Sequence, residues 1–268
     1  MKKNYFLSVL LLSFNICGLA QKSDVKYDFS CYNTDPFTAI NSIGNDFEEA
    51  MLNGSGAESS VSEEQEFGKT AYDEAKKEYK FIESGSELEN LKRIVAKLNK
   101  VIQRPKGYAY KVFLIDTNVV NAWTVGGYIY FTNEMYKFCN SNDEIACILG
   151  HEMAHNELGH IGKHIKRLKA ANNMFGEGFG ILAASLGTLF TTPFNQKNEA
   201  HSDMVGMDYA IAAGYDACQN IDLWKRMKEK EGSYSFINGM LNTHPYSGTR
   251  SDCAKNHLET NYNKDCKN

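Results

Sequence analysis

The sequence lacks the positive charge expected of a nucleic-acid-binding protein. Its 268 residues include 29 Lys and Arg against 33 Asp and Glu, a formal net charge of −4. A protein that binds phosphate backbones usually carries a basic surface. We therefore expect no nucleic-acid partner.

Long apolar runs are scarce after the first 20 residues. The stretch "MFGEGFGILAASLGTLFTTPF" at 174–194 is rich in glycine and is interrupted by Glu177, and Pro193 lies near its end. A membrane-spanning helix needs about 20 consecutive, mostly apolar residues. We expect no transmembrane helix in the mature chain. A buried helix or an apolar flap is favoured, with peripheral membrane contact as the open alternative.

The N-terminus has a different pattern. Lys2 and Lys3 precede "YFLSVLLLSFNICGLA", an apolar run that ends in small residues. This pattern predicts a secretory signal over 1–20. Cys17 would also allow a lipoprotein signal, but Ile16 is bulky where such signals place a small residue. Removing the signal leaves 29 − 2 = 27 positive and 33 negative charges, or −6. We expect an exported protein, in the periplasm or cell exterior of a bacterium.

An even number of cysteines remains after the signal, which fits an oxidising compartment. The sequence predicts disulfides but cannot choose among about fifteen pairings of six cysteines. We expect Cys218, Cys253 and Cys266 to be the structural set, because all three lie well after "HEMAHNELGH" in the chain. Cys147 is expected to be a small buried residue. The six are Cys31, Cys139, Cys147, Cys218, Cys253 and Cys266.

Most of the chain after residue 60 shows regular periodicity, whereas 21–60 is expected to be an irregular lead-in with one short helix. Residues 63–101 suit two amphipathic helices broken at "SGS". "YAYKVFLID" and "YIYFT" predict two strands, with Gly126 and Gly127 in the turn before the second. The chain should therefore contain a small sheet.

Two further helices have clear boundary signals. Ser141 and Glu144 have the spacing of a capping box, which predicts a helix starting near Asn142. A second helix is predicted over 196–213, ended by Gly214.

The first of these helices contains "ILGHEMAHNELGH". Residues four apart lie on one helix face, so His151 and His155 can bind the same zinc ion. Glu152 lies beside the first ligand, where its carboxylate can take a proton from water. His160 is five residues beyond His155, about 140° further round a continuous helix, which predicts a surface or packing role.

The third ligand decides the class of site. A metzincin would need glycine at 158 and histidine at 161, but the chain has Leu158 and Ile161. A glutamate on a later helix is the other common third ligand, and Glu199 is available with Asp203 one turn further on. Glu199 can ligate while Asp203 fixes the tautomer of a ligating histidine.

The sequence resembles the zinc metallopeptidases that include HtpX, BepA, LoiP and the CAAX prenyl proteases. Four stretches carry the resemblance within 65–252: "NAWTVGGYIYFT", "HEMAHNELGH", "EAHSDMVGMDYAIAAGYD" and "THPYSGTR". It implies one zinc ion per chain, bound by His151, His155 and Glu199, with Glu152 as general base. The implied fold is α+β and predominantly helical, a gluzincin-like zinc peptidase domain over 61–268 with a small β-sheet beside the active-site helix. The family usually has alanine where this chain has Ser202.

The resemblance also places "THPYSGTR" over the zinc ion. Pro245 stiffens the loop that carries His244. His244 is expected either to occupy the fourth zinc position as a latch or to donate a hydrogen bond to the oxyanion of the tetrahedral intermediate. Tyr246 and Arg250 are other oxyanion donors, although Arg250 more simply anchors the loop to a carboxylate.

An extended substrate is expected to add to the edge of the strand "GGYIYFT" through backbone hydrogen bonds. This hypothesis assigns substrate binding to Tyr128 and Tyr130. Asn121 and Ala122 begin the segment and are expected to shape the turn and the cleft wall.

Together these features predict a zinc endopeptidase that acts on misfolded or misassembled cell-envelope polypeptides. One alternative is a zinc-holding chaperone or assembly factor with latent or vestigial peptidase activity, and another is a secreted binding module without a metal. The intact Glu152 favours the enzyme, since a chaperone would need only the ligands.

Overall fold

A computed structural model describes residues 24–32, 59–166, 194, 196–230, 244 and 248–266. The predicted signal over 1–20, most of the irregular lead-in, nearly all of the apolar stretch 174–194, and Pro245 with Tyr246 lie outside these described residues. Within the described part, no helix is long and apolar enough to cross a membrane.

The two helices expected over 63–101 are present and separate at "SGS". Helix α2 (Val61–Glu78) begins at Ser60, whose hydroxyl accepts from the Glu63 N–H in a complete capping box. Helix α3 (Ser86–Asn99) follows Gly85, which has φ 132°. Between them lies a short strand, β1 (Lys80–Ile82), that the sequence did not predict.

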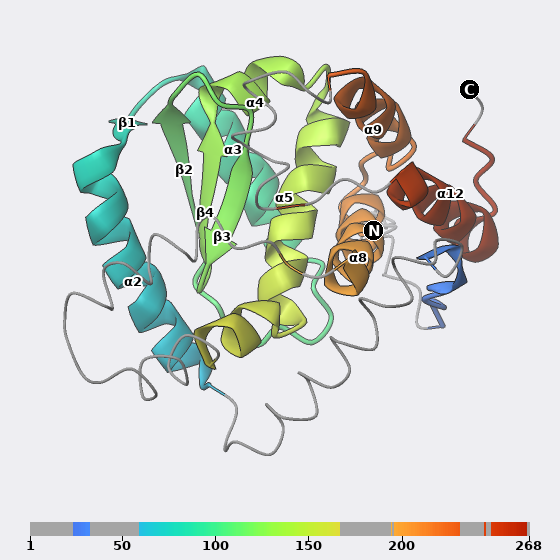
Figure 1. Cartoon of the computed structure of the whole chain (residues 1–268), viewed down its shortest axis with the longest axis horizontal. Coiled ribbons are helices and arrows are strands. Elements are labelled where there is room, and N and C mark those ends of the chain that lie inside the picture. The colour runs from blue at the N-terminus through green and yellow to red at the C-terminus, as the bar shows by residue number, and fades with distance from the viewer. Residues whose placement is uncertain are drawn as a thin grey trace, which may run out of the picture.

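The sheet has four strands among the described residues. The two predicted strands are β2 (Lys111–Asp116) and β4 (Tyr128–Thr132), and they pair in parallel. Strand β3 (Ala122–Val125) pairs antiparallel with β4, and β1 pairs antiparallel with β2. The resulting order is β1-β2-β4-β3 (Figure 1), so β4 is an interior strand and β3 is an edge. A small mixed sheet among helices confirms the predicted α+β, predominantly helical fold.

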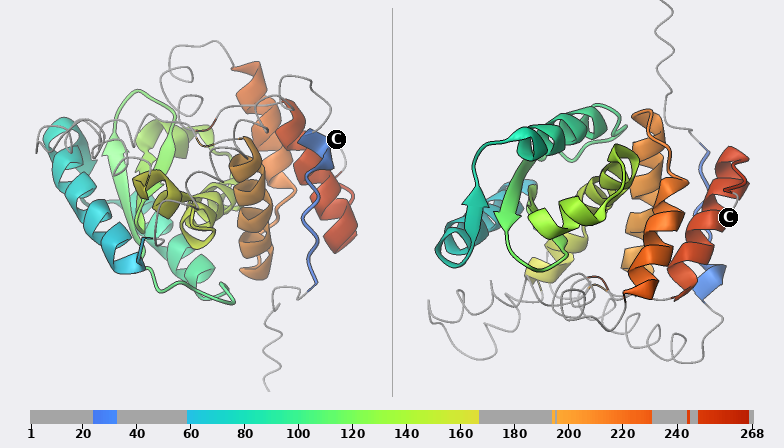
Figure 2. Two further views of the ribbon diagram at one scale, coloured as in Figure 1. Left: turned by 60° about the horizontal axis from the view of Figure 1, so that its bottom comes forward. Right: turned by 90° about the horizontal axis from the view of Figure 1, so that it is seen from above.

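A short helix, α4 (Asn133–Phe138), leads from the sheet to the central helix α5 (Asn142–Glu157). As predicted, the Ser141 hydroxyl caps α5 by accepting from the Glu144 N–H. The Glu144 carboxylate accepts from the Asn140 N–H instead of completing the box. Helix α5 is buried along nearly its whole length, because the sheet and α3 lie on one side of it and later helices on the other (Figures 1 and 2).

The two faces of the sheet have different partners. Ile129 and Phe131 of β4 face the main core, which includes apolar residues of α3 and α5. Tyr128 and Tyr130 alternate with them and face an aromatic cluster beneath α2, where the Tyr130 ring stacks on Trp123 at 5.1 Å.

Helix α8 (Gln196–Ala212) lies directly against α5. It ends before Gly214, which has φ 84°, as the sequence predicted. Two glycines allow the close approach: a Cβ on Gly150 would lie 2.5 Å from the Gly206 carbonyl oxygen, and one on Gly206 would lie 2.5 Å from the His151 nitrogen. This contact brings the metal-binding motif of α5 against α8.

The C-terminal elements complete the layer beside α5 and α8: the last helix packs on α8, and the helix before it packs on α5 and on the last helix. They are α9 (Gln219–Glu229) and α12 (Gly248–Tyr262), with the N-terminal turn η1 (Ser30–Tyr32) beside α12. Two disulfides confirm that the chain forms disulfides and that Cys218, Cys253 and Cys266 take part, with Cys31 as a fourth member that the sequence did not single out. Cys31–Cys253 ties η1 to α12, and Cys218–Cys266 ties the start of α9 to the chain after α12. Cys139 and Cys147 are not in disulfides, and Cys147 is buried as expected.

Candidate metal centre

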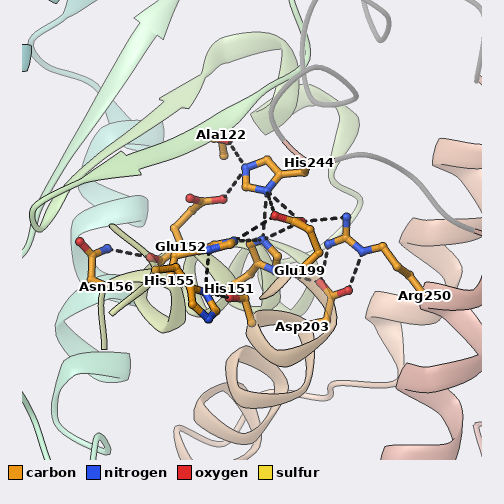
Figure 3. A network of polar contacts seen from close by, with 11 residues as sticks. Ala122, His151, Glu152, His155, Asn156, Glu199, Asp203, His244 and Arg250 are labelled. Carbon is orange, nitrogen blue, oxygen red and sulfur yellow. Dashed lines mark hydrogen bonds and ion pairs between the residues drawn. The ribbon is translucent and has the colours of Figure 1, made fainter. Parts of the chain in front are cut away.

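Side chains from three parts of the chain converge at the contact of α5 with α8 (Figure 3). Helix α5 supplies His151 and His155 from successive turns of one face, and Glu152 next to His151. Helix α8 supplies Glu199, and His244 enters from the chain that precedes α12. All five side chains are buried, with at most 5% of their surface exposed.

Four of these residues form a compact set of potential ligands. One ligand atom from each of His151, His155, Glu199 and His244 lies within 4.8 Å of the others. The Nε2 atoms of His151 and His155 are 2.9 Å apart. A Glu199 oxygen lies 3.3 Å from the Nε2 of His155, and the other lies 3.5 Å from the Nε2 of His151.

The hydrogen-bond partners of the histidines indicate which nitrogen faces the centre of this set. Asp203 accepts from His151 Nδ1 at 2.9 Å, and the Ala122 carbonyl accepts from His244 Nε2 at 3.2 Å. These tautomers, assigned from the network, leave the opposite nitrogens unprotonated. Their lone pairs point toward one another and toward the Glu199 carboxylate, an arrangement that a shared cation would stabilise. Two imidazoles and a carboxylate are a donor set that suits zinc.

Asp203 is itself held by Arg250, a fully buried residue of α12. The arginine donates to both Asp203 oxygens, each at 2.7 Å, and its Nη1 lies 3.0 Å from Glu199. Its guanidinium also lies 4.1 Å from the centre of the Trp224 ring. One arginine therefore orients a metal ligand and the carboxylate that supports another (Figure 3).

The charges of this site are set by burial and by the neighbouring groups. Burial alone would raise the pKa of Glu199, but His244 and Arg250 hold it well below its usual range. Burial lowers the pKa of His244, yet Glu199 and Glu152 outweigh it and raise this pKa to about 9. The carboxylates of Glu199 and Glu152 therefore favour a positive charge at the ligand set, whether a proton on His244 or a metal ion supplies it.

Glu152 has a different environment from Glu199. Burial raises the pKa of its carboxyl group. Neither oxygen has a hydrogen-bond partner among the described residues, although His244 Nε2 lies 3.4 Å from Oε1. A buried carboxylate without hydrogen-bond partners is costly unless it serves a reactant, and this one adjoins the ligand set.

His160 has a closer relation to this site than the sequence indicated. It is only 5% exposed, so the surface alternative is wrong, and its Nδ1 lies 3.1 Å from Nδ1 of His155. The sequence analysis placed His160 by assuming a continuous helix, but α5 ends at Glu157 and the chain turns at Gly159, which has φ 77°. The glycine at 159 was the available signal.

The assignment of substrate binding to Tyr128 and Tyr130 is wrong in its physical basis. Strand β4 is paired on both sides, with β2 and with β3, so its backbone offers no edge. The two tyrosine side chains also point away from the metal-binding residues, into the cluster beneath α2. Short strands such as β3 carry little sequence signal, which hid the true edge.

Asn121 and Ala122 lie closer to the site than the tyrosines. The Asn121 carbonyl accepts from the Thr132 N–H of β4. Because successive residues of a strand point their backbone groups to opposite sides, the Ala122 carbonyl faces outward, where His244 contacts it. Ala122 thus lies at the outer edge of the sheet and next to the ligand set.

The fold and this His-His-Glu site define the class of a metallopeptidase, and comparison with known families agrees. A profile of Peptidase family M48 matches residues 86–257, more than half of the chain. The chain belongs to this family, which confirms the predicted resemblance.

The relatives that the chain matches include mitochondrial metalloendopeptidases and bacterial proteases. Mitochondrial metalloendopeptidase OMA1 of Schizosaccharomyces pombe is 27% identical over 172 residues, covering 60% of this chain and 48% of the relative. The beta-barrel assembly-enhancing protease of Escherichia coli K12 is 23% identical over 165 residues, covering 55% and 34%. The chain thus spans about half or less of the length of these relatives.

Proposed function

We propose that the protein is a zinc-dependent endopeptidase that hydrolyses peptide bonds in misfolded or misassembled cell-envelope proteins. The observation that carries this proposal is the buried set His151, His155 and Glu199, with the Glu152 carboxylate beside it, whose oxygens have no hydrogen-bond partner among the described residues. The bacterial relative named as a beta-barrel assembly-enhancing protease supports the substrate class. Two disulfides support export to an oxidising compartment.

In this mechanism His151, His155 and Glu199 hold the zinc ion, and Asp203 and Arg250 keep two of these ligands oriented. Bound zinc supplies Lewis acidity, which polarises the peptide carbonyl and makes water more acidic. Glu152 takes a proton from the attacking water as the new C–O bond forms. It then gives this proton to the leaving amine as the C–N bond breaks, and returns to its ionised form.

Zinc content tests the foundation of this proposal. The protein purified without chelators should carry about one zinc ion per chain, because two imidazoles and a carboxylate are a donor set that suits catalytic zinc. His155→Ala should lose the metal, while His201→Ala, a histidine of α8 outside the ligand set, should keep it. Elemental analysis measures both. Less than about one tenth of an equivalent in the wild type would instead favour a binding module without a metal.

The geometry of β3 supports a route for substrate. Ala122 and Thr124 point their backbone groups away from β4, by alternation from Asn121. A peptide added to this edge would form backbone hydrogen bonds next to Glu152, with little demand on side-chain identity. Cleavage should therefore be broad in sequence preference.

Peptides methylated on one backbone nitrogen at a time test this route without altering the enzyme. Each methyl group removes one donor, so KM should rise about 2- to 10-fold at alternate positions, the value of one hydrogen bond of 0.5–1.5 kcal/mol. The intervening positions, whose N–H groups face away from β3, serve as the internal control. A uniform effect at every position, or none at all, would contradict binding at this edge.

A further inference from the structure

We infer that His160, held by Ser202, positions the zinc-binding ring of His155. The inference rests on the proposed zinc site and adds two residues to the machinery that supports it. His160 is not a metal ligand here, since it lies outside the four-residue ligand set of the described chain. Its proposed role is to accept a hydrogen bond from His155.

The contacts form a short chain of buried polar atoms. His160 Nδ1 lies 3.1 Å from His155 Nδ1 and 3.2 Å from the Ser202 hydroxyl. Ser202 is fully buried, and His160 is 5% exposed. None of these polar atoms is exposed enough for bulk water to be its main partner, so each depends on the others.

The direction of these hydrogen bonds follows from the chemistry of the ligand. His155 points Nε2 at the ligand set, where a bound metal needs an unprotonated nitrogen. A neutral imidazole then carries its proton on Nδ1, which must donate to an acceptor. Among the described residues His160 Nδ1 is an acceptor within reach, and the Ser202 hydroxyl, 3.2 Å from the same atom, shares its single lone pair with the His155 N–H and holds the ring in place.

A turn of the backbone at Gly159 places His160 beside His155. Helix α5 ends at Glu157, and Gly159 adopts φ 77°, a conformation that favours glycine. The Gly159 N–H donates to the Asn156 carbonyl, and a new helical segment begins at 160. This turn brings His160 back toward His155, although an unbroken helix would have carried it about 140° away.

Helix α8 then supports both metal-binding histidines of α5. Asp203 accepts from His151, and the neighbouring Ser202 holds the acceptor of His155. His151 thus has an anionic outer partner, whereas His155 has a neutral one. Outer partners of this kind fix ring orientation and typically change metal affinity about 10- to 100-fold when removed.

The competing explanation is that His160 merely fills space. Three substitutions separate the two roles. His160→Asn places an amide oxygen where Nδ1 stands and retains the acceptor. His160→Gln carries its polar atoms one bond further out, near the position of Nε2, and His160→Leu fills the space without any acceptor.

Zinc dissociation constants from competition with a fluorescent chelator give the main measurement. The Leu and Gln variants should bind zinc about 10- to 100-fold more weakly, and the Asn variant should stay within about 3-fold of the wild type. Ser202→Ala should weaken binding by less than His160→Leu. The absorption spectrum of the cobalt-substituted protein should shift in the Leu variant and be restored in the Asn variant, which a packing role would not produce.

Melting of the zinc-free proteins separates metal affinity from damage to the fold. The inference is overturned if the Leu variant binds zinc as tightly as the wild type, or if the Asn variant loses as much affinity as the Leu variant. If His160→Leu does not fold, the comparison of Asn with Gln decides the question in the same way. A wild type that takes up no zinc would overturn the proposed function as well, whereas tight binding by every variant would overturn only the role of His160.

Discussion

Replacing Glu152 with glutamine should lower the rate of peptide hydrolysis by about 10²- to 10⁴-fold and leave zinc binding unchanged. Glutamine has nearly the same shape but cannot accept a proton from water at neutral pH. The carboxylate is not in the ligand set, and its oxygens make no hydrogen bonds among the described residues. Its Oε1 lies 3.4 Å from His244 Nε2, so the exchange removes the charge of that contact but no hydrogen bond among these residues.

The measurement is cleavage of casein, together with the zinc content of the same samples. Glu157→Gln is the matched control, because it makes the same chemical change on the same helix, at a carboxylate that accepts from Tyr110 and the Lys106 N–H instead. Equal cleavage by wild type and Glu152→Gln would contradict the catalytic role. Full zinc occupancy with no cleavage by the wild type would favour the zinc-holding chaperone.

A cleavage-site profile of a denatured proteome would extend this test to specificity. Wild type and Glu152→Gln are compared side by side, so that cuts made by contaminating proteases appear in both samples. The edge of β3 offers backbone groups to the substrate, and we expect cuts without a strong preference at any single side chain.

The features that the sequence predicted well depend on local rules. The cap at Ser141, the helix end before Gly214 and the spacing of His151 and His155 on one face are all set by residues within a turn or two. The approach of Glu199 to these histidines depends on tertiary packing, but the order of motifs in the family made it predictable.

The features that the sequence missed depend on contacts between distant segments. The order β1-β2-β4-β3 puts a four-residue strand at the edge, and nothing within "AWTV" distinguishes an edge from a turn. Cys31 pairs with Cys253 across 222 residues, a choice that spacing could not make. In each case the partner is decided by how the helices and the sheet pack.

The position of His244 bears directly on whether the enzyme is active at rest. Its Nε2 hydrogen-bonds the outward-facing Ala122 carbonyl, and its Nδ1 lies 3.0 Å from Glu199 and 3.2 Å from His151 Nε2. The same ring therefore lies at a fourth ligand position and on the edge where substrate would add. Both contacts favour the latch over the oxyanion donor, because a substrate bound to β3 must displace His244.

His244→Ala should therefore raise basal cleavage of casein by about 10- to 100-fold, as expected if about 1.4–2.8 kcal/mol holds the latch closed. An oxyanion donor predicts the opposite sign, a fall in kcat of roughly 10²-fold. The initial rate at low substrate concentration distinguishes them, since a latch matters most before substrate has opened it. His201→Ala, a histidine substitution outside the ligand set, should change neither quantity. An unchanged rate in His244→Ala would remove this residue from the mechanism. The buried His244 ring contacts Glu199 and Ala122, so its removal must change the rate of cleavage if it either blocks the site or stabilises the oxyanion.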